Sequence, residues 1–176
     1  MPNKNIKHLP SYVSKVVLEI YKDEFVYVSP DNLVFHPDTS TLTGNLIYRG
    51  APYWKRESKI FNNTEAMFAF NQAGYLLAIC VFSQDDGFDI FDESFSESIQ
   101  NYVKVLGQFV IKEQMFKFDG MISDDKATIP FVAKRLRGKK TPQGHYFVCS
   151  VNIGEKNQFT VTSKIFLLKN NVHCEF

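Results

Sequence analysis

The feature that most constrains this chain is an apolar stretch in its middle, over residues 62–80 (NNTEAMFAFNQAGYLLAIC). Asn62 is a suitable helix N-cap, and Glu65 follows it at the spacing of a capping box. Behind this start the apolar side chains point in nearly every direction around a helix. A helix that is apolar on all sides is normally buried in the middle of a fold. We therefore expect residues 62–80 to form a central helix.

The composition is typical of a single folded domain over residues 1–176. Hydrophobic residues make up 44% of the chain and charged residues 22%, which excludes wholesale disorder. Lys and Arg total 20 against 19 Asp and Glu, and this balance argues against a nucleic-acid or membrane-surface binder. The 17 Phe residues indicate either a generously packed core or an apolar pocket for a greasy ligand.

The cysteines and the apolar runs indicate where in the cell the protein is expected and whether a metal site is expected. Cys80, Cys149 and Cys174 have no paired spacing, so we expect neither a structural zinc site nor a disulfide framework. The N-terminal residues have no signal-peptide pattern, and we expect a reducing, cytoplasmic location. The longest apolar run, residues 66–82, is interrupted by polar residues, so no membrane span is expected. We find no motif for a metal or a cofactor and expect neither.

The other expected elements flank the central helix. Residues 10–22 show helical spacing of apolar side chains behind a start signal. The acidic residues 84–97 are expected to form a loop or a surface helix. Before the central helix, strands are expected at residues 25–28 and 33–35, on either side of a turn at 29–32, and at 42–49. After it, strands are expected at 102–118, with a break near Glu113, and at 129–137. The last two strands are expected at 146–153 and 159–168, joined by a hairpin connection at 154–157.

This order predicts an α+β domain in which a curved antiparallel sheet wraps the long apolar helix. That is the hotdog arrangement. Such a domain normally dimerises, because the partner supplies a sheet edge and a pocket wall, so we expect a homodimer or a higher homo-oligomer.

Polar residues inside the apolar helix are the first candidates for chemistry. Asn71 and Gln72 could hydrogen-bond a substrate carbonyl or amide. The alternative is that both satisfy neighbouring backbone groups inside the core. The buried helix N-terminus could also polarise a carbonyl group.

Phenol, imidazole and thiol groups are the next candidates. Tyr21 and Tyr53 could donate a hydrogen bond to an oxyanion or relay a proton, or they could simply pack in the core. His36 and His145 stand far apart in the sequence, and neither has an obvious nucleophile beside it. Cys80 is expected to be an inert core thiol.

A basic run lies at residues 134–140 (KRLRGKK). It is either a solvated hairpin or a docking patch for a phosphate-bearing carrier, such as coenzyme A or an acidic acyl-carrier protein.

The motif IFNNTE at residues 60–65, followed by FNQAGY at 70–75, resembles the central-helix signature of the FcoT family. These are hotdog proteins first described as long-chain fatty-acyl thioesterases. The family pattern is H-F-N-x-x-E, five variable residues, then N-Q-x-x-Y, and this chain departs from it only at Ile60, which replaces the His. Residues 18–21 (LEIY) and 50–53 (GAPY) are similar to two upstream family motifs. The resemblance covers about residues 10–82.

The resemblance implies a catalytic set of Tyr21, Tyr53 and Asn71 around a tunnel that holds the acyl chain. Further positions in or near the matching motifs are expected to bind the substrate: Asn62, Glu65, Gln72, Tyr75 and Arg56.

The resemblance also implies two chemistries on acyl-carrier-protein or coenzyme A thioesters. Family members in isonitrile-lipopeptide pathways add glycine across the double bond of an enoyl thioester, and others hydrolyse fatty-acyl thioesters. We favour glycine addition, because Glu65 is the only acid on the central helix and is interpreted as a cap, which leaves no strong base for hydrolysis. Arg49, Lys55 or Arg56 could hold the glycine carboxylate.

Two other interpretations remain. A non-catalytic acyl-binding or interaction module of the same fold is consistent with Ile60 in place of the His. A dehydratase-like hotdog enzyme would pair a His with a carboxylate on the central helix, and the nearest upstream histidine is His36.

Overall fold

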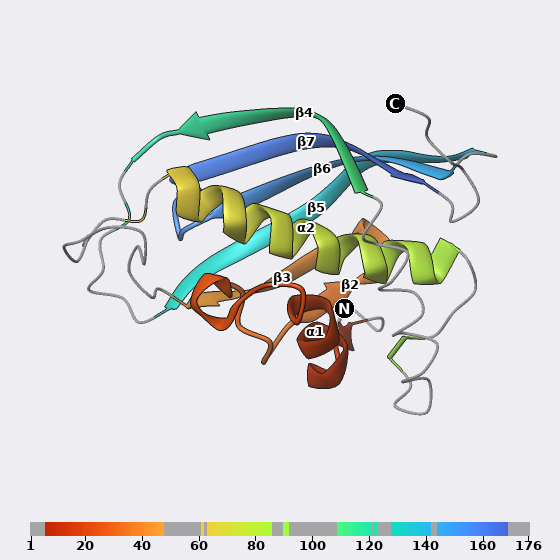
Figure 1. The fold of residues 1–176 in the computed structure, drawn as a ribbon, viewed down its shortest axis with the longest axis horizontal. Coiled ribbons are helices and arrows are strands. Elements are labelled where there is room, and N and C mark those ends of the chain that lie inside the picture. Colours follow the sequence, from red (N-terminus) through yellow and green to blue (C-terminus); the bar gives the residue numbers. More distant parts are fainter. Residues whose placement is uncertain are drawn as a thin grey trace.

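One long helix lies against a curved antiparallel sheet (Figure 1). The structure, a computed structural model, describes residues 6–47, 61, 63–85, 90–91, 109–120, 122, 128–141 and 144–168. Within these ranges the helices, 3₁₀ turns and strands are, in chain order, β1 (Lys7–His8), α1 (Ser11–Leu18), η1 (Asp23–Phe25), β2 (Val34–His36), η2 (Pro37–Thr39), β3 (Thr41–Ile47), α2 (Asn63–Asp85), β4 (Phe109–Phe118), β5 (Thr128–Thr141), β6 (Gly144–Ile153) and β7 (Phe159–Leu168).

The described strands form one seven-stranded sheet in the order β1-β2-β3-β5-β6-β7-β4, in which every neighbouring pair is antiparallel. α2 crosses one face of this sheet and contacts β3, β5, β6 and β7 (Figure 1). The arrangement confirms the predicted α+β class, with a sheet that wraps a central helix.

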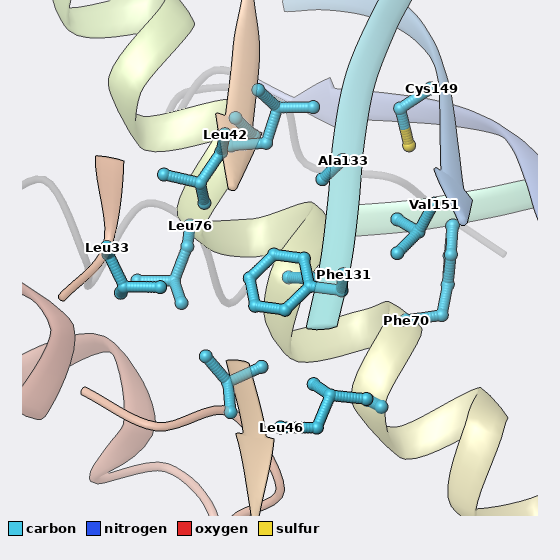
Figure 2. Close-up of a cluster of buried hydrophobic side chains, with 14 of the residues drawn as sticks. Leu33, Leu42, Leu46, Phe70, Leu76, Phe131, Ala133, Cys149 and Val151 are labelled. Carbon is cyan, nitrogen blue, oxygen red and sulfur yellow. The ribbon is translucent and has the colours of Figure 1, made fainter. Parts of the chain in front are cut away.

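The core forms where α2 meets the sheet. Figure 2 shows Phe70 and Leu76 of α2 among side chains from β3, β5 and β6, including Leu42 and Phe131, and all four are fully buried. Gly44 of β3 belongs to this contact, because a Cβ atom there would collide with the side chains of Leu33 and Phe131. The apolar character of α2 is thus explained by the burial of most of its side chains against the sheet and the rest of the core.

α2 also corrects the expectation drawn from residues 66–82. The helix has 23 residues and contains an apolar window with a mean hydropathy of 1.5, so it is long and apolar enough to cross a membrane. However, 78% of its apolar window is buried inside the protein, as in the core helix of a folded domain. The reason to interpret this stretch as a core helix is therefore its burial against the sheet, and not the polar residues that interrupt it.

The N-terminal elements are shorter than predicted. α1 spans Ser11–Leu18 and ends four residues before the expected end at residue 22. A tighter turn replaces its last residues, because Tyr21 N–H donates to the Leu18 carbonyl, three residues back, at 2.9 Å. Of the extended segment expected over residues 25–35, only Val34–His36 is a strand, and Val28 forms an isolated bridge with Leu46.

Gln72 explains why residues 25–28 are not a regular strand. Its Oε1 accepts the N–H groups of Tyr27 at 2.8 Å and Val28 at 2.9 Å, and its Nε2 donates to the Phe25 carbonyl at 2.6 Å. On its other side this segment meets β3, where Ile47 N–H donates to the Tyr27 carbonyl at 2.7 Å. A side chain of α2 therefore takes the place of a second neighbouring strand.

The C-terminal strands follow the prediction closely. The break expected near Glu113 is a shift in the β4–β7 register between Ile111 and Glu113. The expected hairpin connection between β6 and β7 is confirmed, with Gly154 and Asn157 at positive φ angles of 90° and 53°. Most of the acidic stretch 84–97, and residues 102–108 of the strand expected at 102–118, lie outside the described residues.

Two of the three cysteines belong to the core. Cys80 of α2 and Cys149 of β6 are fully buried. Burial raises the pKa of the Cys149 thiol to about 12 and raises the pKa of Cys80 well above its ordinary value. Both thiols are therefore protonated at neutral pH, which agrees with the inert role expected for Cys80. Cys174 lies outside the described residues.

The Gln72 contacts predict a stability loss on substitution. In Gln72→Leu the buried backbone groups of residues 25–28 lose their partners, and each unpaired group costs about 1–3 kcal/mol. We expect the free energy of unfolding, measured by equilibrium urea denaturation, to fall by about 3 kcal/mol or more. The control is Gln84→Leu at the exposed end of the same helix, which should change it by less than about 0.5 kcal/mol. Equal effects of the two substitutions would contradict the structural role of Gln72.

The thiol environments predict slow alkylation. In the native protein at pH 8, N-ethylmaleimide should leave Cys80 and Cys149 unmodified, because the thiolate is the reactive form and burial suppresses it. Peptide mass spectrometry with and without urea measures this, and both residues should react fully once the chain is unfolded. Rapid labelling of either residue in the native protein would show that the core around it opens.

Candidate functional site

The candidate site lies on the one stripe of α2 that the core does not cover. Most side chains between Asn63 and Asp85 are buried. Exposed and partly exposed side chains in the first half of the helix recur at helical spacing: Thr64, Met67, Phe68, Asn71 and Tyr75. The helix therefore presents a short outward face on the side away from the sheet.

Asn71 sits at the centre of this outward face. Its residue is partly exposed, but its Oδ1 atom is buried and has no hydrogen-bond partner among the described residues. An unpaired buried acceptor costs about 1–3 kcal/mol, so such atoms are rare in native proteins and need an explanation. An amide that binds a ligand and not its own chain provides one.

Two phenol groups accompany Asn71. Tyr75 follows it by one helical turn, so their side chains are neighbours on the surface of α2. Tyr21, from the segment after α1, packs against the core, and its phenol lies close enough to Tyr75 for the two to interact electrostatically. Tyr75 thus lies beside Asn71 on α2, and Tyr21 of the segment after α1 lies near Tyr75.

Burial keeps both phenols neutral. Removal from water raises the pKa of Tyr21 far above its ordinary value of 10.0, and the nearby Tyr75 raises it further. Burial also raises the pKa of Tyr75. Both groups are therefore hydrogen-bond donors at physiological pH and do not act as phenolate bases.

An aromatic wall borders the outward face on the α1 side. The ring of Phe68 lies 5.3 Å from the ring of Phe25 and 6.2 Å from that of Tyr27, measured between centroids. Phe68 precedes Asn71 by three residues, so this wall stands directly beside the amide. The polar groups of the candidate site therefore adjoin an apolar surface suited to a hydrocarbon chain.

Of the other predicted residues, the structure describes Gln72 and Glu65, and both lie away from the outward face. Gln72 points toward the backbone of residues 25–28, as in the structural alternative considered for it. Glu65 is fully buried in the first turn of α2. Tyr53, Asn62 and Arg56 lie outside the described residues, so their predicted roles stay predictions.

The two histidines considered as candidates, His36 and His145, do not join this site. His36 ends β2, and His145 of β6 is buried with its ring 4.5 Å from the ring of Phe82, near the far end of α2. In the part of the chain that the structure describes, no three His, Cys, Asp or Glu side chains cluster as metal ligands do. The outward face of α2 from Thr64 to Tyr75 has no carboxylate or imidazole among its residues.

The basic run falls on β5. Arg135 is neutralised by Asp85 at 3.1 Å, whereas Lys134, Arg137, Lys139 and Lys140 are exposed. These four cations form the basic patch of the sheet, and they lie toward the β5–β6 hairpin.

Sequence analysis missed a hollow beside α1. A cavity of about 320 Å³ lies there, lined by Lys15, Leu18, Glu19, Asp23, Val26 and Pro30. The sequence signal that could have found it is the spacing of Lys15, Glu19 and Asp23 by four residues each, which continues one helical face past the end of α1.

Comparisons with known proteins bear on the fold. A scan against protein-family models and a search of curated proteins found no match for this chain. Among solved structures, a proposed thioesterase from Syntrophus aciditrophicus matches with a TM-score of 0.54 and 9% identity, over 90% of this chain and 95% of that chain.

Two further solved structures are similar at lower TM-scores. The HP0420 homologue from Helicobacter felis has a TM-score of 0.49 and 13% identity, over 88% of this chain and 99% of that chain. A mutant of thioesterase PA1618 from Pseudomonas aeruginosa has a TM-score of 0.46 and 10% identity, over 77% of this chain and 79% of that chain. The likeness to the Syntrophus structure, at 9% identity, shows the hotdog fold alone and does not single out the FcoT family.

Proposed function

We propose that this protein is a hotdog-fold enzyme of the FcoT type that adds glycine to a (2E)-enoyl thioester held on an acyl-carrier protein or on coenzyme A. The observation that carries the proposal is the unpartnered Oδ1 of Asn71, buried on the outward face of α2 beside Tyr75 and Tyr21. An apolar helix in a packed core retains such an atom at a cost to stability, and a bound substrate would satisfy it.

The reaction matches the groups present. The ammonium group of glycine first gives one proton to water. The free amine nitrogen then bonds to the β-carbon of the enoyl thioester, and the electrons of the C=C bond shift toward the thioester carbonyl. A proton then reaches the α-carbon, the nitrogen loses one, and no group leaves. The site must polarise the carbonyl and hold the amine in line with the β-carbon. The Asn71 amide offers a donor at Nδ2 for the carbonyl and an acceptor at Oδ1 for the amine N–H.

Tyr21 and Tyr75 complete this scheme. Because burial keeps both phenols protonated, they can donate hydrogen bonds to the carbonyl oxygen as negative charge develops on it. Tyr21 is the better protected from water and is the proposed proton relay to the α-carbon. The partly exposed rings of Phe68 and Phe25 in this aromatic wall would contact the acyl chain, and the buried Tyr27 would support them.

Hydrolysis is the alternative chemistry, and the described part of the site supports it less. Water needs a general base to attack a thioester, whereas glycine brings its own nucleophile. The outward face of α2 has neither carboxylate nor imidazole between Thr64 and Tyr75. The fully buried Glu65 belongs to a different face of the helix, since it lies six residues before Asn71 in the sequence.

Surface features support the proposed partners. The basic patch on β5, Lys134, Arg137, Lys139 and Lys140, would suit a phosphate-bearing acyl carrier. β4 is an edge strand of the described sheet, and Ile111, Met115, Phe116 and Phe118 are exposed along it. An apolar edge of this kind favours a homo-oligomer.

A turnover assay separates the chemistries. The protein is incubated with a medium-chain (2E)-enoyl thioester, with and without glycine, and the products are measured by mass spectrometry. We expect an adduct equal in mass to the sum of the two reactants, formed only with glycine. Free enoic acid without glycine would favour hydrolysis. Binding of the thioester with no product of either kind would favour a non-catalytic acyl-binding module.

Substitution of Asn71 separates a catalytic from a structural role. Asn71→Leu removes the unpaired acceptor, so the free energy of unfolding should stay the same or rise by up to about 2 kcal/mol. Turnover should fall by about 100-fold or more, the scale seen when one oxyanion donor is removed. The matched control is Asn63→Leu, an exposed asparagine in the first turn of α2, which should leave turnover unchanged. Loss of stability with full turnover would assign Asn71 to the core.

A further inference from the structure

The cavity beside α1 has the size and walls of a small-molecule site. Its volume of about 320 Å³ is at the lower end of the range of known ligand pockets, about 300–1,000 Å³. Three elements build it: the second half of α1, η1, and residues 26–30. None of these residues belongs to the candidate site on α2.

Hydrogen bonds hold the walls of the cavity in place. Ser14 of α1 is buried and donates to the Pro30 carbonyl at 2.9 Å, which ties the helix to the opposite wall. Val26 N–H donates to the Asp23 carbonyl at 3.2 Å. Gln72 binds the backbone on both sides of Val26. The backbone around the cavity is therefore preformed, whereas the side chains of Lys15, Glu19 and Asp23 are exposed and a ligand would have to order them.

The lining combines both signs of charge over an apolar floor. Lys15 supplies one cation, and Glu19 and Asp23 supply two carboxylates. None of the three forms an ion pair with another residue of the described ranges. Leu18, Val26 and Pro30 supply the apolar surface, and Leu18 is almost fully buried.

We infer that this cavity binds a free α-amino acid as its zwitterion. Lys15 would bind the carboxylate, Glu19 and Asp23 the ammonium group, and the floor a short apolar side chain or the Cα of glycine. A simple anion would face two carboxylates, and a fatty acyl chain would face three charged groups. A molecule that carries both charges a few bonds apart fits the lining better than either.

The inference rests on the proposed function, because it names a site that holds the amine reactant before that reactant reaches Asn71. The two sites share one segment of chain: Tyr21 lies between the cavity residues Glu19 and Asp23 in the sequence and interacts electrostatically with Tyr75 of α2. Amino acid held in the cavity is thus bound next to the segment that carries a proposed catalytic phenol.

Ligand-observed NMR with the full chain tests the binding, using glycine and L-valine as separate probes and no thioester. We expect saturable binding of at least one probe, with methylammonium and acetate competing at least about 10-fold more weakly because each lacks one charge. Lys15→Met and Asp23→Asn should each weaken binding about 10-fold or more. The matched controls are Lys22→Met and Glu24→Gln, neighbouring exposed residues that do not line the cavity and should bind normally.

The outcomes separate this inference from the proposed function. Lys15-dependent binding without any adduct in the turnover assay would support the cavity and remove the proposed reaction. If the adduct forms and the Lys15→Met variant has the same KM for glycine as the unaltered protein, the cavity assignment is overturned and the proposed reaction stands. Absence of saturable binding of both probes, or equal loss with Lys22→Met, would also overturn it.

Discussion

The structure depends on the burial of one helix that is apolar on every side. Such a helix cannot rest on a sheet and leave its back to water without a large cost, because each exposed apolar side chain forgoes about 1.5–3 kcal/mol of burial energy. Here the sheet covers one side of α2, and α1 with residues 25–28 covers another. The curvature of the sheet and the position of the N-terminal segment both follow from the need to enclose α2.

Much of this architecture could be predicted from the sequence, because it rests on local patterns. The central helix, the C-terminal strands, the β6–β7 connection and the irregularity near Glu113 all have signals within a few residues. The prediction was wrong for residues 25–28, which look like a strand by composition. Their backbone partners are Gln72, far along the chain, and β3, and no short-range pattern reveals a side chain that substitutes for a strand.

The candidate site was predictable in part for the same reason. Asn71 and Tyr75 stand out as polar groups at neighbouring positions of an apolar helix. Tyr21 could be linked to them only through the family resemblance, since the contact with Tyr75 joins two distant segments. The cavity beside α1 was missed because it needs the fold of three elements at once. Charged residues on a short helix look like an ordinary solvated face until the opposite wall is known.

The contacts of Gln72 have a consequence for the orientation of α2. An amphipathic helix has a defined rotation about its axis because only one face is apolar, but a helix that is apolar all round has no such preference. The amide of Gln72, fixed to three backbone groups, supplies the missing rotational reference. Because Asn71 is the preceding residue, about 100° around the helix, the same lock directs its amide away from the backbone of residues 25–28. One polar side chain in the core thereby aims its neighbour outward.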